Sequence, residues 1–110
     1  MIVIAGSFRF DDGVTEDVTA ACKSVMEATH QEEGCHEYIF YPDPLDSNIL
    51  RVFEMWEDAQ SLNNHFGTSH VDAFRKAMGG WTISERAVSY THLRAHETRE
   101  DRVCRLLREK

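Results

Sequence analysis

Apolar residues near the start of the chain change their spacing once, from a period of two to a helical period. Residues 2–10 mix apolar and β-branched side chains, with large apolar residues at alternate positions, a pattern that indicates a β-strand. On one side of this segment lie Ile2, Ile4, Phe8 and Phe10. Asp, Asp and Gly at positions 11–13 are typical of a turn. The change of period after that turn predicts a strand followed by a helix.

The predicted helix begins after Thr15 and ends before Gly34. Its apolar residues recur at i, i+3, i+4, i+7 and i+8, which places them on one helix face. They are Val18, Ala21, Cys22, Val25 and Met26. Thr15 is a suitable N-cap because its hydroxyl oxygen can accept a hydrogen bond from a backbone N–H. Gly34 suits the position just past the C-terminus of the helix.

Two further strands are expected to form a hairpin in the middle of the chain. Residues 35–41 alternate, with Tyr38 and Phe40 on one face. Two prolines and several polar residues at 42–48 predict a turn, because proline presets the backbone and lacks an N–H donor. Residues 49–56 then predict the partner strand.

The second helix is expected to be broken in two. Asp58 begins a short helix, and Gly67 interrupts it. Ser69, with Asp72 three residues later, resembles the capping box of a second short helix. The inner faces of these helices would carry Leu62, His65, Phe66, Val71, Phe74 and Met78. Residues 81–88 predict the final strand.

The predicted order is β-α-β-β-α-β, which is the ferredoxin-like order of an α+β domain with an antiparallel sheet. We assign this domain to residues 1–89. A chain of 110 residues cannot hold a second core, so the sheet face without helices is expected to be covered by a second copy in a homodimer. Residues 90–110 turn basic and rich in Arg. They predict either a helical or disordered tail foreign to the domain, or a helix that docks on it.

Composition excludes several classes of partner. The net charge of −7 argues against nucleic acid and against anionic membrane surfaces, since both bind basic proteins. No apolar run approaches the roughly 20 residues that span a bilayer, and the first residues lack the basic stretch of a signal peptide. The 3 cysteines are widely spaced and odd in number, which predicts neither a disulfide framework nor a zinc site. We therefore expect a protein of the reducing cytoplasm.

Two histidines are the candidates for catalysis, because glycine-rich phosphate loops and nucleophile elbows are absent from the sequence. His65 is expected to point inward. His70 would stand at the first position of a helix, where the helix dipole disfavours a positive imidazole. A neutral imidazole can accept a proton, so His70 is the candidate general base. Packing is the commoner role for such histidines. His92 and His96 lack a third ligand, and no metal site is predicted.

Aromatic side chains are spread over three strands and both short helices, and most are expected to form the core. Some would instead line an apolar pocket for an aromatic ligand. The candidates for that pocket are Tyr38, Phe40, Trp56, Phe66, Phe74 and Trp81. Glu54 lies on the inner side of its strand. It is expected to pair with Arg51 or Arg75, or else to act as an acid or base with a shifted pKa.

The sequence resembles the antibiotic biosynthesis monooxygenase (ABM) family over residues 2–88. The resemblance is carried by Glu32-Glu33-Gly34-Cys35, Tyr41-Pro42-Asp43-Pro44, Phe53-Glu54-Met55-Trp56-Glu57-Asp58, His65-Phe66, Ser69-His70 and Ala73-Phe74. Each motif alone is weak, but their order and spacing together are specific. The resemblance implies a dimeric α/β barrel built from two ferredoxin-like subunits.

The resemblance also implies an activity, namely oxidation of a phenol or quinol by O2 without a metal or organic cofactor. His70, with His65 and Trp56 near it, would then serve the substrate pocket. The family also has members without known activity, so a stress-linked barrel that binds a small aromatic or lipophilic ligand without catalysis is the alternative. Haem degradation is disfavoured, because alignment through Ala73-Phe74 places Arg75 where haem-degrading members carry a histidine.

Overall fold

The structure, a computed structural model, describes residues 1–92 and confirms the predicted order of elements. Its elements are the strands β1 (Ile2–Phe10), β2 (Cys35–Asp43), β3 (Asp46–Trp56) and β4 (Ile83–His92) and the helices α1 (Glu16–Thr29), α2 (Ala59–Phe66) and α3 (Ser69–Met78). This is the α+β, ferredoxin-like arrangement, with the second helix divided at Gly67 as expected. None of the described helices is long and apolar enough to cross a membrane.

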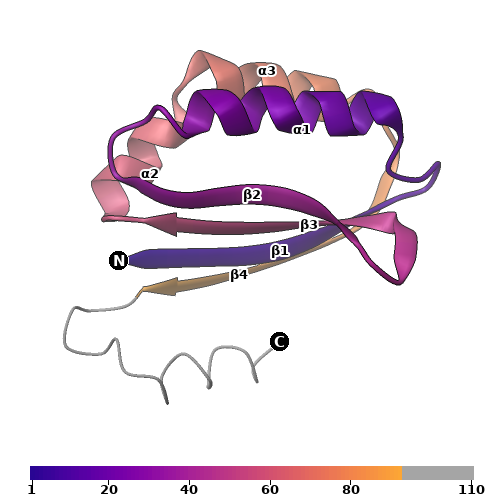
Figure 1. The fold of residues 1–110 in the computed structure, drawn as a ribbon, viewed down its shortest axis with the longest axis horizontal. Coiled ribbons are helices and arrows are strands. Elements are labelled where there is room, and N and C mark those ends of the chain that lie inside the picture. The colour runs from indigo at the N-terminus through magenta and orange to yellow at the C-terminus, as the bar shows by residue number, and fades with distance from the viewer. Residues whose placement is uncertain (93–110) are drawn as a thin grey trace.

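The four strands form one sheet in the order β2-β3-β1-β4, and every neighbouring pair is antiparallel. All three helices lie over the same face of this sheet (Figure 1). The side chains of β3 show the consequence, because alternate residues from Leu50 to Trp56 are buried while the residues between them are partly exposed. Among residues 1–92, the helices therefore cover one face of the sheet and leave the other face open.

Helix α1 begins as predicted and ends earlier than predicted. The Thr15 side chain accepts a hydrogen bond from the backbone N–H of Val18 at 3.4 Å. The helix stops at Thr29, with His30 rather than Gly34 at its C-terminal boundary. Gly34 instead has a φ of +85° in the turn that leads into β2, where a left-handed backbone favours glycine. The prediction that Gly34 ends the helix was therefore wrong, and the glycine is required by the turn instead.

The starts of α3 and β4 also differ from the predictions. Thr68, not Ser69, caps α3, because its backbone is extended and its hydroxyl accepts from the N–H of Val71 at 3.4 Å. His70 is therefore the second residue of the helix and not the first. Strand β4 begins at Ile83 and continues to His92, beyond the expected end at 88. The prediction for the remaining tail, and the pairing of His92 with His96, fall outside the described residues.

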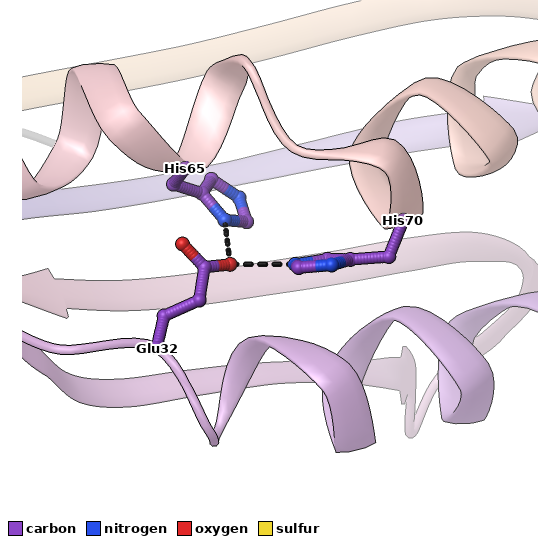
Figure 2. A group of neighbouring side chains, drawn as sticks. All are labelled: Glu32, His65 and His70. Atoms are coloured by element: carbon purple, nitrogen blue, oxygen red, sulfur yellow. Dashed lines mark hydrogen bonds and ion pairs between the residues drawn. The ribbon is translucent and has the colours of Figure 1, made fainter.

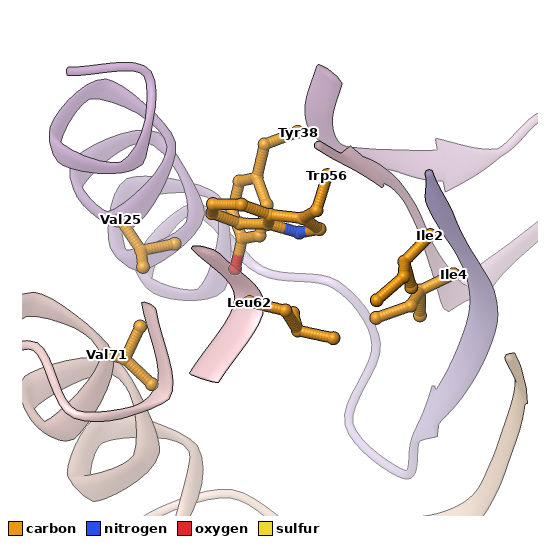
Figure 3. Close-up of a cluster of buried hydrophobic side chains, with 7 residues drawn as sticks. All are labelled: Ile2, Ile4, Val25, Tyr38, Trp56, Leu62 and Val71. Carbon is orange, nitrogen blue, oxygen red and sulfur yellow. The ribbon is translucent and has the colours of Figure 1, made fainter. Parts of the chain in front are cut away.

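Two neighbouring groups of buried side chains form the core. One contains Phe10, Val18, Cys22, Leu50 and Met78. The other, drawn in Figure 3, contains Ile2, Ile4, Val25, Tyr38, Trp56, Leu62 and Val71. Full burial of one such apolar side chain contributes about 1.5–3 kcal/mol. The second group joins both short helices to the sheet, so it fixes where the break between these helices lies.

Candidate active site

A carboxylate and two histidines meet at the break between α2 and α3. The Oε2 atom of Glu32 lies 2.7 Å from Nδ1 of His65 and 2.6 Å from Nε2 of His70. Figure 2 shows both imidazole rings directed at this one oxygen. The His65 side chain is 3% exposed, that of Glu32 13% and that of His70 23%. The cluster therefore extends from the protein interior to the surface.

Short-range contacts hold the three side chains in place. Glu32 follows the end of α1, where its backbone N–H donates to the carbonyl of Thr29 at 2.9 Å. His65 lies in the last turn of α2, and its carbonyl accepts the hydroxyl of Thr68 at 2.7 Å. Because Thr68 also caps α3, one residue connects the end of the helix that carries His65 to the start of the helix that carries His70.

The contacts with Glu32 restrict which ring nitrogens carry protons. An ionised Glu32 can only accept hydrogen bonds, so the ring nitrogens that face it must carry the protons. His65 then has its N–H at Nδ1 and its lone pair at Nε2. Burial lowers the pKa of His65, and the hydrogen bond and charge of Glu32 oppose that shift. His65 is accordingly a neutral imidazole at physiological pH, held in one tautomer by a carboxylate.

A cavity of about 330 Å³ lies between the sheet and the helices. This volume is in the range of small-ligand sites. Its wall includes six residues proposed from the sequence: Tyr38, Phe40, Glu54, His65, Phe66 and Phe74. The remaining wall residues were not proposed as part of a pocket: Phe8, Val52, Val71, Arg75, Met78, Gly79 and Arg86. The cavity wall is thus rich in aromatic rings, and His65 contributes an imidazole to it.

Three other candidate residues lie away from the cavity wall. His70 does not line it, and its ring instead bonds Glu32. Trp56 is 0% exposed and packs in the core, with its ring centroid 4.7 Å from that of His65. Trp81 packs edge-to-face on Phe10 at 6.3 Å. Trp56 therefore supports the ring of His65 from the core side.

Glu54 has a different partner from the one that the sequence suggested. Its Oε1 accepts the indole N–H of Trp56 at 2.9 Å, whereas Arg51 bonds Asp43 at 2.8 Å. Arg75 donates to the carbonyl of Phe66 at 3.4 Å. Burial raises the pKa of Glu54, while the indole hydrogen bond opposes the shift. The cavity wall thus contains a carboxyl group whose neutral form is favoured more than usual.

Two guanidinium groups also reach the cavity. Arg75 lies with its Cζ 5.9 Å from the ring centroid of Phe66, and Arg86 projects from β4. Within the described part of the chain neither residue has an ion-pair partner. Sequence reasoning missed Arg86 because a single exposed charge in a strand carries no local signal. It missed Glu32 as a functional residue because the histidines that it bonds are 33 and 38 positions away.

Comparison with known proteins identifies one matching family and one relative of similar sequence. Residues 1–77 match the family described as antibiotic biosynthesis monooxygenase. An uncharacterized protein of Synechocystis, sll1783, is 32% identical over 73 residues, which cover 66% of this chain and 50% of that protein. The chain therefore spans half the length of this relative.

Solved structures share the fold at low sequence identity. A conserved protein from Methanosarcina mazei has a TM-score of 0.76 at 24% identity, over 84% of this chain and 92% of that one. Rv0793 from Mycobacterium tuberculosis has a TM-score of 0.74 at 22% identity, over 84% and 94%. A structure described as an antibiotic biosynthesis monooxygenase has a TM-score of 0.76 at 19% identity, over 86% and 99%. These likenesses establish the fold alone.

Proposed function

This chain belongs to the antibiotic biosynthesis monooxygenase family, and we propose that it oxidises a phenolic or quinol-type aromatic substrate with O2 and no cofactor. The observation that carries the proposal is the placement of His65, a buried imidazole held by Glu32 at the wall of an aromatic cavity. A phenol bound there would meet a proton acceptor and a wall rich in aromatic rings. A base and a surface that holds the ring are what such a reaction needs from a protein, together with shielding from water.

His65, rather than His70, is the proton acceptor in this proposal. Only His65 of the two lines the cavity. Glu32 accepts its Nδ1–H, which leaves the lone pair of Nε2 to take a phenolic proton. A carboxylate that fixes the tautomer of a histidine base and stabilises the imidazolium is a recurrent arrangement in hydrolases. His70 is a positioning residue, because its contact is with Glu32 and not with the cavity.

The cavity wall suits an aromatic anion. The rings of Tyr38 and Phe40 meet edge-to-face at 5.6 Å, and those of Phe40 and Phe74 lie 5.1 Å apart. They offer a flat aromatic ligand both stacking and edge contacts. Arg75 and Arg86 place positive charge at the same wall, and positive charge stabilises a phenolate once the proton has left.

The redox chemistry then balances between the substrate and O2. The phenolate passes one electron to O2, and the resulting phenoxyl radical and superoxide combine to form a carbon–oxygen bond. The peroxide anion formed in this way takes back from His65 the proton that the phenol gave up. Loss of water from that hydroperoxide leaves a quinone. One oxygen atom of O2 enters the product and the other leaves as water, so O2 gains four electrons and the phenol loses four. The protein needs to supply only the proton acceptor and the enclosure.

Oxygen uptake with isotope labelling tests this proposal. Metal-free protein, prepared with a chelator, is mixed with a panel of phenols, hydroquinones and naphthols under ¹⁸O2. We expect one ¹⁸O in the quinone and one in water. A simple oxidase would instead leave the quinone unlabelled and release peroxide. No turnover above the protein-free rate across the panel would refute the proposal, and ligand-induced stabilisation without turnover would instead support the binding-module alternative.

The matched variants are His65→Phe and His36→Phe. The first keeps a ring against Trp56 but removes the proton acceptor, and we expect kcat to fall about 10²–10⁴-fold. The second removes another histidine that bonds a carboxylate, since His36 Nε2 lies 2.6 Å from Glu57, on the exposed surface and away from the cavity wall. We expect kcat of His36→Phe to stay near that of the parent chain. Equal losses in the two variants would contradict the role of His65.

The open face of the sheet supports the proposal of a homodimer. Ala5, Phe53 and Ile39 are paired across β1, β3 and β2, and residues directly opposite one another project to the same side. Phe53 lies between the buried positions of β3, so this side is the one without helices. Ile39 and Tyr41 remain 37% and 39% exposed there. A sheet face that exposes apolar side chains of this kind is a surface that a second copy would cover.

A further inference from the structure

We propose that Glu32, His65 and His70 also form a binding site for a divalent transition-metal ion of the Zn²⁺ class. The proposal goes beyond the oxidation of a phenol, because it uses Nδ1 of His65 as a metal ligand, whereas the proposed oxidation uses Nε2. Two imidazole nitrogens and one carboxylate oxygen are a donor set that suits zinc, cobalt and nickel better than magnesium or calcium.

The geometry of the three donors is close to what such an ion requires. All three donor atoms lie within 4.8 Å of one another. A tetrahedral ion with bonds of roughly 2.0–2.1 Å needs donors about 3.3 Å apart. The present contacts of 2.6 and 2.7 Å to Oε2 of Glu32 would have to open by less than an ångström. Glu32 can supply that movement, because it lies in a turn after α1 and not inside a helix. The two ring nitrogens, which lie within 4.8 Å of each other, would have to settle at the same spacing of about 3.3 Å.

The environment of the cluster offers both an anchor and an entrance. His65 is nearly fully buried and packs against the rings of Trp56 and Tyr38, at centroid distances of 4.7 and 5.1 Å. Glu32 and His70 are partly exposed. An ion could thus enter from the solvent side and keep a water molecule as its fourth ligand, which is the usual state of a zinc site with three protein ligands.

Metal binding would change the tautomer of His65. The ion needs the lone pair of Nδ1, so the proton of the neutral ring must move to Nε2. His65 would then present an N–H to the cavity and could no longer accept a proton there. The metal-bound and base-competent states exclude each other. Where the chain oxidises a phenol, Zn²⁺ is therefore expected to inhibit the reaction and a chelator to restore it.

Titration of the full, metal-free chain with Co²⁺ tests the site directly. We expect saturation at one ion per chain, with the visible absorption bands of a low-coordinate cobalt complex, and displacement of those bands by Zn²⁺. Glu32→Gln and His70→Ala each remove one donor, and we expect either change to weaken binding at least about tenfold. Melting curves of both variants without metal show whether they fold. Co²⁺ binding of unchanged strength in both variants would overturn the proposal, as would its absence in the parent chain.

Two matched controls separate this cluster from other histidines. His36→Ala removes a histidine that lies 2.6 Å from the carboxylate of Glu57 at the surface. The double change His92→Ala and His96→Ala removes two histidines that are four positions apart in the sequence. We expect both to bind Co²⁺ as the parent does. A loss in either control, without a loss in His70→Ala, would assign the ion elsewhere. Cobalt absorption is measured without any substrate. The proposed metal site and the proposed oxidation can therefore be refuted independently of each other.

Discussion

Substitution of Gly34 by Ala is the sharpest test of how the turn before β2 is built. Gly34 has a φ of +85°, and a residue with a side chain in the left-handed region costs roughly 1–2 kcal/mol. An added Cβ would also lie 2.6 Å from Cβ of Ser61 and in contact with its hydroxyl. Overpacking of this kind costs roughly 1–3 kcal/mol. We therefore expect Gly34→Ala to lower the free energy of unfolding by roughly 2–5 kcal/mol.

The two contributions can be separated, because only one of them depends on Ser61. Ser61→Ala keeps the Cβ and should leave most of the clash in place. Ser61→Gly removes it, at its own cost of about 1 kcal/mol for glycine inside a helix. In that background Gly34→Ala should cost only the backbone part, roughly 1–2 kcal/mol. Urea unfolding of the four chains of the double-mutant cycle measures the difference.

The result also bears on the active site. The clash cannot be relieved by rotating a side chain, because it involves a Cβ atom of α2. The helix that carries His65 would have to move relative to the turn that carries Glu32. If Gly34→Ala costs the same amount with Gly and with Ser at position 61, steric overlap is not its cause and this reasoning is wrong.

Three further predictions concern the buried carboxyl group, the core tryptophan and the open face. Burial raises the pKa of Glu54 above 4.5, so the stability linked to it is present at low pH and is lost as pH rises through the folded pKa. Glu54→Gln should therefore raise the thermal midpoint at neutral pH, with a gain that shrinks as pH falls through the raised folded pKa and does not change further below pH 4.5. A lower midpoint at neutral pH would contradict this. Trp56→Phe removes the indole N–H that donates to Glu54 and makes a fully buried side chain (0% exposed) smaller. We therefore expect the free energy of unfolding, measured in urea, to fall by about 1–3 kcal/mol. A loss below about 0.5 kcal/mol would show that the indole is not needed there. Phe53→Glu should shift the sedimentation coefficient to that of a monomer, whereas Leu45→Glu, at a position 95% exposed in a turn, should leave it unchanged. Identical sedimentation of the two variants would argue against dimerisation through the open face.

The hydrophobic pattern predicted the elements well, because each element buries one face and that face repeats with the period of its own backbone. The stripe from Val18 to Val25 gave α1, and the alternation in β3 gave a strand with one buried side. Turn residues gave the break at Gly67. Such signals are local, since they arise from a residue and its neighbours within about four positions.

Element ends were predicted less well, because one residue type serves several local structures. Gly34 was compatible with a helix end and with a turn in the left-handed region, and the structure uses it in the turn. The sequence prediction placed the N-cap of α3 at Ser69, but the neighbouring Thr68 has the same capping chemistry. The choice went to Thr68, whose hydroxyl accepts from Val71 and donates to the carbonyl of His65. Only the packing of two helices against each other makes that double contact available.

The sequence by itself determined the α+β order, the broken second helix and the two histidines as groups worth testing. The tertiary structure alone decided that Glu32 bonds both of them, that His65 and not His70 reaches the cavity, and that Trp56 supports the ring from the core. The reason is distance along the chain. Periodicity reports which side of its own element a residue faces, whereas a carboxylate and an imidazole more than 30 positions apart meet only when packing brings their elements together.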